Sequence, residues 1–161
     1  MRVLLPAIVS CAIAVVPCPS RAATPAQTIH QLVGSWNCVT TDTNHKAWRV
    51  VAKYSKFGSW LQMRAAYPAQ NGQRPGSIVK FFGFDSDQGR WIVTSVDTSG
   101  EFYVIDSKSK NFDGSRWEDA YPADVGTAAV KVQSSNEYTF DAQVPIGGGH
   151  DYQSHTICKR M

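Results

Sequence analysis

Hydrophobic and polar residues alternate along several short runs of this chain. In "NEYTFDAQV" (136–144), apolar side chains occupy every second position from Tyr138 to Val144, and polar side chains fill most of the positions between them. The runs "KAWRVVAKY" (46–54) and "WLQMRAAY" (60–67) alternate in the same way. Successive side chains of a strand point to opposite faces. The pattern therefore predicts antiparallel strands with one buried and one solvent-facing side.

Two runs in the middle of the chain alternate poorly. They are "IVKFFGF" (78–84) and "RWIVTSV" (90–96), in which apolar residues follow one another directly. A strand that is apolar on both sides needs cover on both sides. We expect other side chains to cover the outer face of these two strands.

Turn-forming residues separate the runs every eight to twelve residues, as in "DSDQG" (85–89) and "DTSG" (97–100). Glycine, asparagine, aspartate and serine favour such turns. Only "AQTIHQLV" (26–33), before the first strand, suggests a short helix. We therefore expect an all-β fold with nine or ten antiparallel strands. Such a meander forms either a sandwich or an up-and-down barrel of eight to ten strands.

The first residues predict an export signal. Arg2 precedes the apolar run Val3–Val16, which is shorter than the roughly 20 residues that a membrane-spanning helix needs. Ser20 and Ala22 suit a cleavage site. We expect residues 1–22 to be removed, which leaves a single domain at 23–161 in the periplasm or outside the cell. Two alternatives are a buried N-terminal segment and a lipid anchor on Cys11.

The two ends of the predicted domain suggest that its first and last strands pair. In antiparallel strands, paired residue numbers have a constant sum. The pair Cys38 and Cys158 has the same sum as the pair Trp36 and Arg160, so one register aligns both pairs on one face. Pairing of the first strand with the last closes a barrel and removes both sheet edges. This argument favours the barrel over the sandwich.

Cys38 and Cys158 are the two cysteines that remain after the predicted cleavage. In an exported chain such a pair predicts a disulfide. The alternative is two free thiols or a metal pair, but a CxxC motif is absent from the sequence. Arg160, two residues after Cys158, is placed to lie over the Trp36 indole as a cation–π partner.

The residues at these ends resemble the calycin superfamily, which includes lipocalins, avidins, fatty-acid-binding proteins and nitrobindin-like barrels. A short helix is followed by Gly-x-Trp, here Gly34 and Trp36, and a basic residue on the last strand, here Arg160, packs across the tryptophan. The segment "FFGFDSDQGRWIVTSVDTSG" (81–100) resembles part of a bacterial lipocalin-like domain of unknown function. The resemblance implies a ligand-binding barrel.

Charge and motifs exclude several classes of function. Loss of two arginines with the signal lowers the net charge from +3 to +1, which gives no basis for nucleic-acid binding. Nucleophile-elbow, metalloprotease and phosphate-loop motifs are absent from the sequence. His150 and His155 would lie on opposite faces of a strand. We expect no enzyme activity, metal, cofactor or membrane span, and a monomer or weak dimer.

The aromatic residues indicate a binding cavity. The chain has five tryptophans, six tyrosines and seven phenylalanines, all after residue 22. Some simply fill the core, and those nearer an open end would line a pocket with hydroxyl groups. The candidates for lining residues are Trp48, Tyr54, Met63, Tyr67, Phe81, Trp117, Tyr138, Phe140 and Tyr152.

Three functional hypotheses follow. The first is an exported barrel that binds a small apolar or amphipathic molecule without catalysis. The second is a haem-binding or enzymatic calycin that uses the same cavity, since haem ligation requires only one histidine. The third is a structural or interaction protein of the cell envelope that has no ligand.

Overall fold

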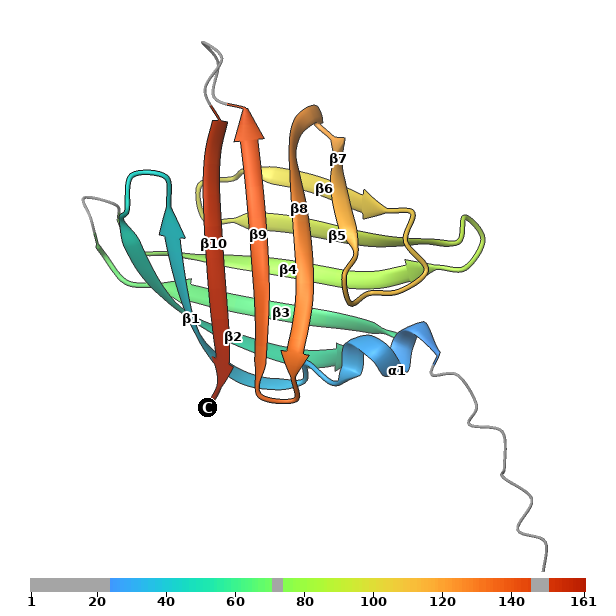
Figure 1. The fold of residues 1–161 in the computed structure, drawn as a ribbon. Coiled ribbons are helices and arrows are strands. Elements are labelled where there is room, and N and C mark those ends of the chain that lie inside the picture. The colour runs from blue at the N-terminus through green and yellow to red at the C-terminus, as the bar shows by residue number, and fades with distance from the viewer. Residues whose placement is uncertain (1–23, 71–73, 146–150) are drawn as a thin grey trace, which may run out of the picture.

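The protein forms a closed antiparallel β-barrel with one short helix (Figure 1). The structure is a computed structural model and describes residues 24–70, 74–145 and 151–161. The predicted signal peptide lies outside these residues. The elements are α1 (Pro25–His30), β1 (Gly34–Asp42), β2 (Ala47–Phe57), β3 (Trp60–Tyr67), β4 (Gly76–Asp85), β5 (Arg90–Asp97), β6 (Phe102–Ser107), β7 (Arg116–Tyr121), β8 (Ala123–Ser134), β9 (Glu137–Pro145) and β10 (Asp151–Arg160).

Each strand pairs with its neighbour in the sequence, and β1 closes the ring by pairing with β10. The predicted all-β, up-and-down barrel is therefore confirmed, with ten strands. Figure 1 shows β8, β9 and β10 crossing in front of β2 to β6, so the wall has two facing layers. The inward side chains of both layers form the core.

The seam between β1 and β10 has the predicted register. Cys38 pairs with Cys158 and Trp36 pairs with Arg160, and a disulfide joins the two cysteines. Their separation in sequence is 120 residues. In the chain-entropy model, a loop of this length stabilises the fold by roughly 4–5 kcal/mol. The disulfide thus fixes the one strand pair that closes the ring.

The prediction that both faces are covered is confirmed for β4. On its outer face, the Phe81 ring lies 5.3 Å from the Phe57 ring, measured between centroids. Gly83 lies under Trp60, where an added Cβ would come within 2.0 Å of the indole. The glycine therefore lets the tryptophan lie flat on the strand.

The expectation that Phe81 points into the barrel is wrong. Its neighbours Lys80 and Phe82 both line the interior, so Phe81 has the opposite orientation. Its ring packs against Phe57, which is 61% exposed. Because Phe81 and Phe82 are adjacent and both apolar, strand alternation alone could not show which of the two rings faces the interior.

Helix α1 closes one end of the barrel, where β2 finishes and β3 begins (Figure 1). Thr24 caps its N-terminus in a reciprocal pair of hydrogen bonds with Gln27. Ile29 and, just after the helix, Leu32 are fully buried. The Leu32 carbonyl accepts a 2.8 Å hydrogen bond from Nε1 of Trp36. These contacts fix the segment between α1 and β1 to the barrel.

Arg160 ties this segment to the seam. Its guanidinium donates to the carbonyls of Val33 and Gln31, at 2.7 Å each, and to the carbonyl of Ser135 at 2.8 Å. Its Cζ lies 4.4 Å from the centroid of the Trp36 ring. One side chain therefore joins the helix end, the β8–β9 turn and the first strand.

Gly34 is required by this arrangement for two reasons. Its φ is +136°, a backbone conformation that side chains with a Cβ rarely adopt. An added Cβ would also lie 2.6 Å from Nη1 of Arg160. The Gly-x-Trp pattern is therefore explained by the space that the arginine needs.

Arg160→Lys should lower the free energy of unfolding by about 2–3 kcal/mol, measured by denaturant titration. A lysine keeps the charge but cannot reach three carbonyls in one plane. The control is Lys159→Met, because Lys159 is exposed on the opposite face and pairs only loosely with Glu137. The control should cost less than about 0.5 kcal/mol. Equal stability of Arg160→Lys and the wild type would contradict the role of the guanidinium.

Candidate ligand-binding site

A cavity of about 270 Å³ lies inside the barrel. Each of the ten strands contributes at least one inward side chain to its lining, and β7 contributes Trp117. Most of the lining is apolar, with Val50, Ile78 and Phe82 as examples. Such a lining with few polar groups is typical of small-molecule sites.

Five of the nine residues proposed from the sequence line this cavity. They are Tyr54, Met63, Trp117, Tyr138 and Phe140. They come from β2, β3, β7 and β9, which are far apart in sequence. Closure of the ring brings them together.

Trp48, Tyr67 and Tyr152 have the inward orientation but do not line the cavity. Each belongs to the end of its strand that lies away from α1 (Figure 1). All three are half-buried. Burial raises the pKa of the Tyr152 phenol, and the negative charge of Asp42 raises it further. The fourth residue outside the cavity is Phe81, on the outer face.

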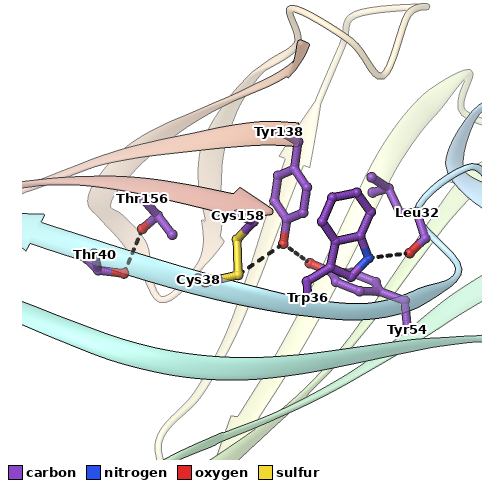
Figure 2. Close-up of a disulfide and its surroundings, with 8 residues drawn as sticks. All are labelled: Leu32, Trp36, Cys38, Thr40, Tyr54, Tyr138, Thr156 and Cys158. Carbon is purple, nitrogen blue, oxygen red and sulfur yellow. Dashed lines mark hydrogen bonds between the residues drawn. A yellow bond between two sulfur atoms is a disulfide. The ribbon is translucent and has the colours of Figure 1, made fainter. Parts of the chain in front are cut away.

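A chain of hydroxyl groups connects the cavity wall to the disulfide (Figure 2). The oxygens of Tyr54 and Tyr138 lie 2.6 Å apart, and the Tyr138 oxygen lies 3.8 Å from Sγ of Cys38. A disulfide sulfur has no proton, so Tyr138 donates to it. The Tyr138 oxygen then accepts from the Tyr54 hydroxyl.

Both phenols resist ionisation. Burial raises the pKa of Tyr138 to about 12, although the hydrogen bond from Tyr54 works against this rise. Burial also raises the pKa of Tyr54 well above its usual value, and the charge that Tyr138 would carry raises it further. At neutral pH both hydroxyls are therefore uncharged hydrogen-bonding groups.

A second polar pair lies further along the seam. The hydroxyls of Thr40 on β1 and Thr156 on β10 lie 2.8 Å apart (Figure 2). Both residues line the cavity. One of these hydroxyls donates to the other, and the proton of the accepting hydroxyl has no side-chain partner among the described residues.

The cation of this site was not predicted from the sequence. Lys80 on β4 lines the cavity, and its Nζ lies 5.2 Å from the Tyr103 ring centroid and 5.5 Å from the Phe140 ring centroid. Its position within the apolar run 78–84 was the available signal, because a lone charge in such a run is unusual.

The described histidines lie away from this cavity. None is among its lining residues. His155 contacts the Asp141 carboxylate on the outer face of β9 and β10, and His150 is not among the described residues. No group of three potential metal ligands occurs within the described parts of the chain.

A larger depression of about 690 Å³ is lined by residues of β1, β7, β8, β9 and β10. Its lining includes Arg116, Asp141, Gln143 and His155. The side chains of Asp141, Gln143 and His155 are exposed. The lining of this depression is more polar than that of the interior cavity, and the depression is open, whereas the barrel wall surrounds the interior cavity.

Comparisons with known proteins identify the fold and not a family. No family model matches the chain, and no curated protein matches it. Among solved structures, a redesigned β-barrel, b11L5F_LGL, aligns with a TM-score of 0.54 at 13% identity, covering 86% of this chain and 99% of that one. A fluorescence-activating β-barrel designed de novo aligns with a TM-score of 0.52 at 12% identity, with the same coverage.

A third similar structure, the redesigned barrel mFAP0, is bound to DFHBI. It aligns with a TM-score of 0.51 at 11% identity and covers 81% of this chain and 99% of its own. At these identities the likeness shows a shared lipocalin-like barrel fold. No helix among the described residues is long and apolar enough to cross a membrane.

The buried phenols predict a loss of stability at alkaline pH. The unfolded chain releases phenolic protons near pH 10, whereas the folded protein keeps them. Their contribution to the free energy of unfolding is therefore complete below pH 10 and is lost as the pH rises to about 12. Denaturant titration across this range should show the fall.

Tyr138→Phe should make this alkaline fall shallower, because one buried phenol is gone. The control is Tyr121→Phe, whose ring is 60% exposed and which should keep the wild-type slope. The same slope for Tyr138→Phe and the wild type would contradict the assignment.

Proposed function

We propose that this protein is an exported, lipocalin-like barrel of the calycin type that binds a small apolar or amphipathic molecule in its interior without catalysis. The observation that carries the proposal is the apolar cavity of about 270 Å³. Its volume is close to the lower limit of the roughly 300–1,000 Å³ typical of small-molecule sites. A cavity of this volume fits a compact ligand.

The polar groups of the cavity support binding over catalysis. Tyr54 and Tyr138 remain protonated at neutral pH, since burial raises both pKa values. Thr40 and Thr156 bond to each other. A nucleophile needs a neighbouring base or a lowered pKa, and these four hydroxyls have neither among the described residues. They are uncharged hydroxyls without an activating partner, which supports binding without catalysis.

Two features support the calycin assignment and the export. Gly34, Trp36 and Arg160 form the contact that the resemblance implies, at the end of the barrel that α1 closes. The Cys38–Cys158 disulfide is the kind of bond that persists in oxidising compartments. Together with the apolar leader at residues 1–22, it supports a periplasmic or secreted protein, with a lipid anchor at Cys11 as the alternative.

The similar designed barrel mFAP0 is bound to DFHBI. A lipocalin-like barrel of this size therefore has room for a small organic molecule. This likeness supports the binding of a small molecule. The chemistry of that molecule is inferred from the cavity of this chain.

Binding can be tested with Nile red, an uncharged dye that fluoresces in apolar surroundings. The wild-type protein should bind it in a saturable way. Val50→Phe should weaken this binding by about tenfold or more, because Val50 lines the cavity and the larger ring occupies ligand volume. Fluorescence titration measures both affinities.

The matched control is Val51→Phe. Val51 is the next residue of β2, but its side chain is 51% exposed on the outer face. This variant should bind Nile red like the wild type. An absence of saturable binding, or equal binding by Val50→Phe and the wild type, would overturn the proposed site.

A further inference from the structure

Lys80 has an unusual position for a lysine, because it faces the barrel interior. On β4 it lies between Met63 of β3 and Ser95 of β5 in the strand register. It lines the same cavity as Tyr54 and Phe82. A charged side chain in such a place usually has an opposite charge as partner.

No salt bridge joins Lys80 to any side chain that the structure describes. Its ammonium group lies instead near the rings of Tyr103 and Phe140, at 5.2 and 5.5 Å from their centroids. Cation–π contacts of this kind contribute about 0.5–1 kcal/mol each at exposed sites. They orient the ammonium group and leave its hydrogen-bond donors available.

Ser95, the cross-strand neighbour of Lys80, is also without a partner. Its side chain is buried, with 1% exposure, and its Oγ makes no hydrogen bond within the described residues. Nε1 of Trp117, another residue of the cavity lining, is buried and unpaired in the same way. Buried polar groups without partners are rare in native proteins.

The cavity therefore has an excess of donors. Lys80 and Trp117 line the cavity and can only donate, whereas Ser95 lies beside Lys80 but outside the lining. The protons of Tyr54 and Tyr138 are already used in hydrogen bonds, and the threonine pair uses one of its two protons. The cavity lining that the structure describes includes no aspartate or glutamate. The interior is matched to a ligand that brings negatively charged acceptor oxygens.

We propose that the cavity binds a small amphipathic carboxylate, whose headgroup accepts hydrogen bonds from the ammonium group of Lys80. Its apolar part contacts the remaining lining, which includes Val93, Ile105 and Val130. This inference rests on the proposed binding function and adds the chemical class of the ligand. The volume of about 270 Å³ favours a medium-chain acid over a long-chain acid.

Calorimetric titration with octanoate and octanol tests the proposal, because the two molecules share a chain and differ in charge. At neutral pH the wild type should bind octanoate. Lys80→Met should weaken octanoate binding about 10- to 100-fold, as expected for loss of a hydrogen bond to a charged group. Octanol binding should change by less than about threefold, which also shows that the variant is folded.

Two further variants sharpen the test. Lys80→Arg keeps the charge and should retain most of the octanoate affinity. Lys53→Met removes an exposed lysine of β2 and should leave octanoate binding unchanged.

The outcomes separate this inference from the proposed function. Octanoate affinity that is equal in Lys80→Met and the wild type would overturn the carboxylate assignment. Binding of octanol without binding of octanoate would overturn it as well and would leave the proposed ligand-binding function in place. Binding of neither molecule would contradict the carboxylate assignment, and the Nile red titration would then decide on the cavity itself.

Discussion

The pairing of β1 with β10 is the constraint on which the rest of the structure depends. It turns a meander of neighbouring strands into a ring without edges. It also sets the register that aligns Cys38 with Cys158 and Thr40 with Thr156. Both pairs face the interior and line the cavity. The seam is therefore at once the closure of the barrel and one wall of the candidate site.

Large aromatic side chains form part of the wall around the cavity. Phe112 and Trp117 line it, and together with Trp91 they make successive edge-to-face contacts. Smaller side chains such as Val50 and Ile78 line it on other strands and leave space for a ligand. The same interior therefore provides both the packing of the barrel and the volume of the candidate site.

Much of the fold could be predicted from the sequence, because independent signals agreed on it. Strand alternation indicated the meander, and two residue pairs at its ends required one register. The site was less predictable. Alternation is uninformative where Phe81 and Phe82 are adjacent, so the wrong ring was assigned to the interior. Lys80 was not recognised, since a lysine normally faces solvent. The sequence also did not show that Trp48 lies outside the cavity. The position of a residue along the barrel axis depends on the tilt of its strand, and alternation does not reveal this tilt.

The 120-residue separation between Cys38 and Cys158 also has a consequence for how the chain acquires its structure. The strand that closes the ring is the last of the ten to leave the ribosome. Until then β1 has only one of its two neighbours, and the guanidinium that fixes the helix end is missing. Contacts of such long range are slow to form, because the entropy of loop closure opposes them until the strands between them are ordered. We therefore expect the contact between the first and last strands to form late in the assembly of this barrel.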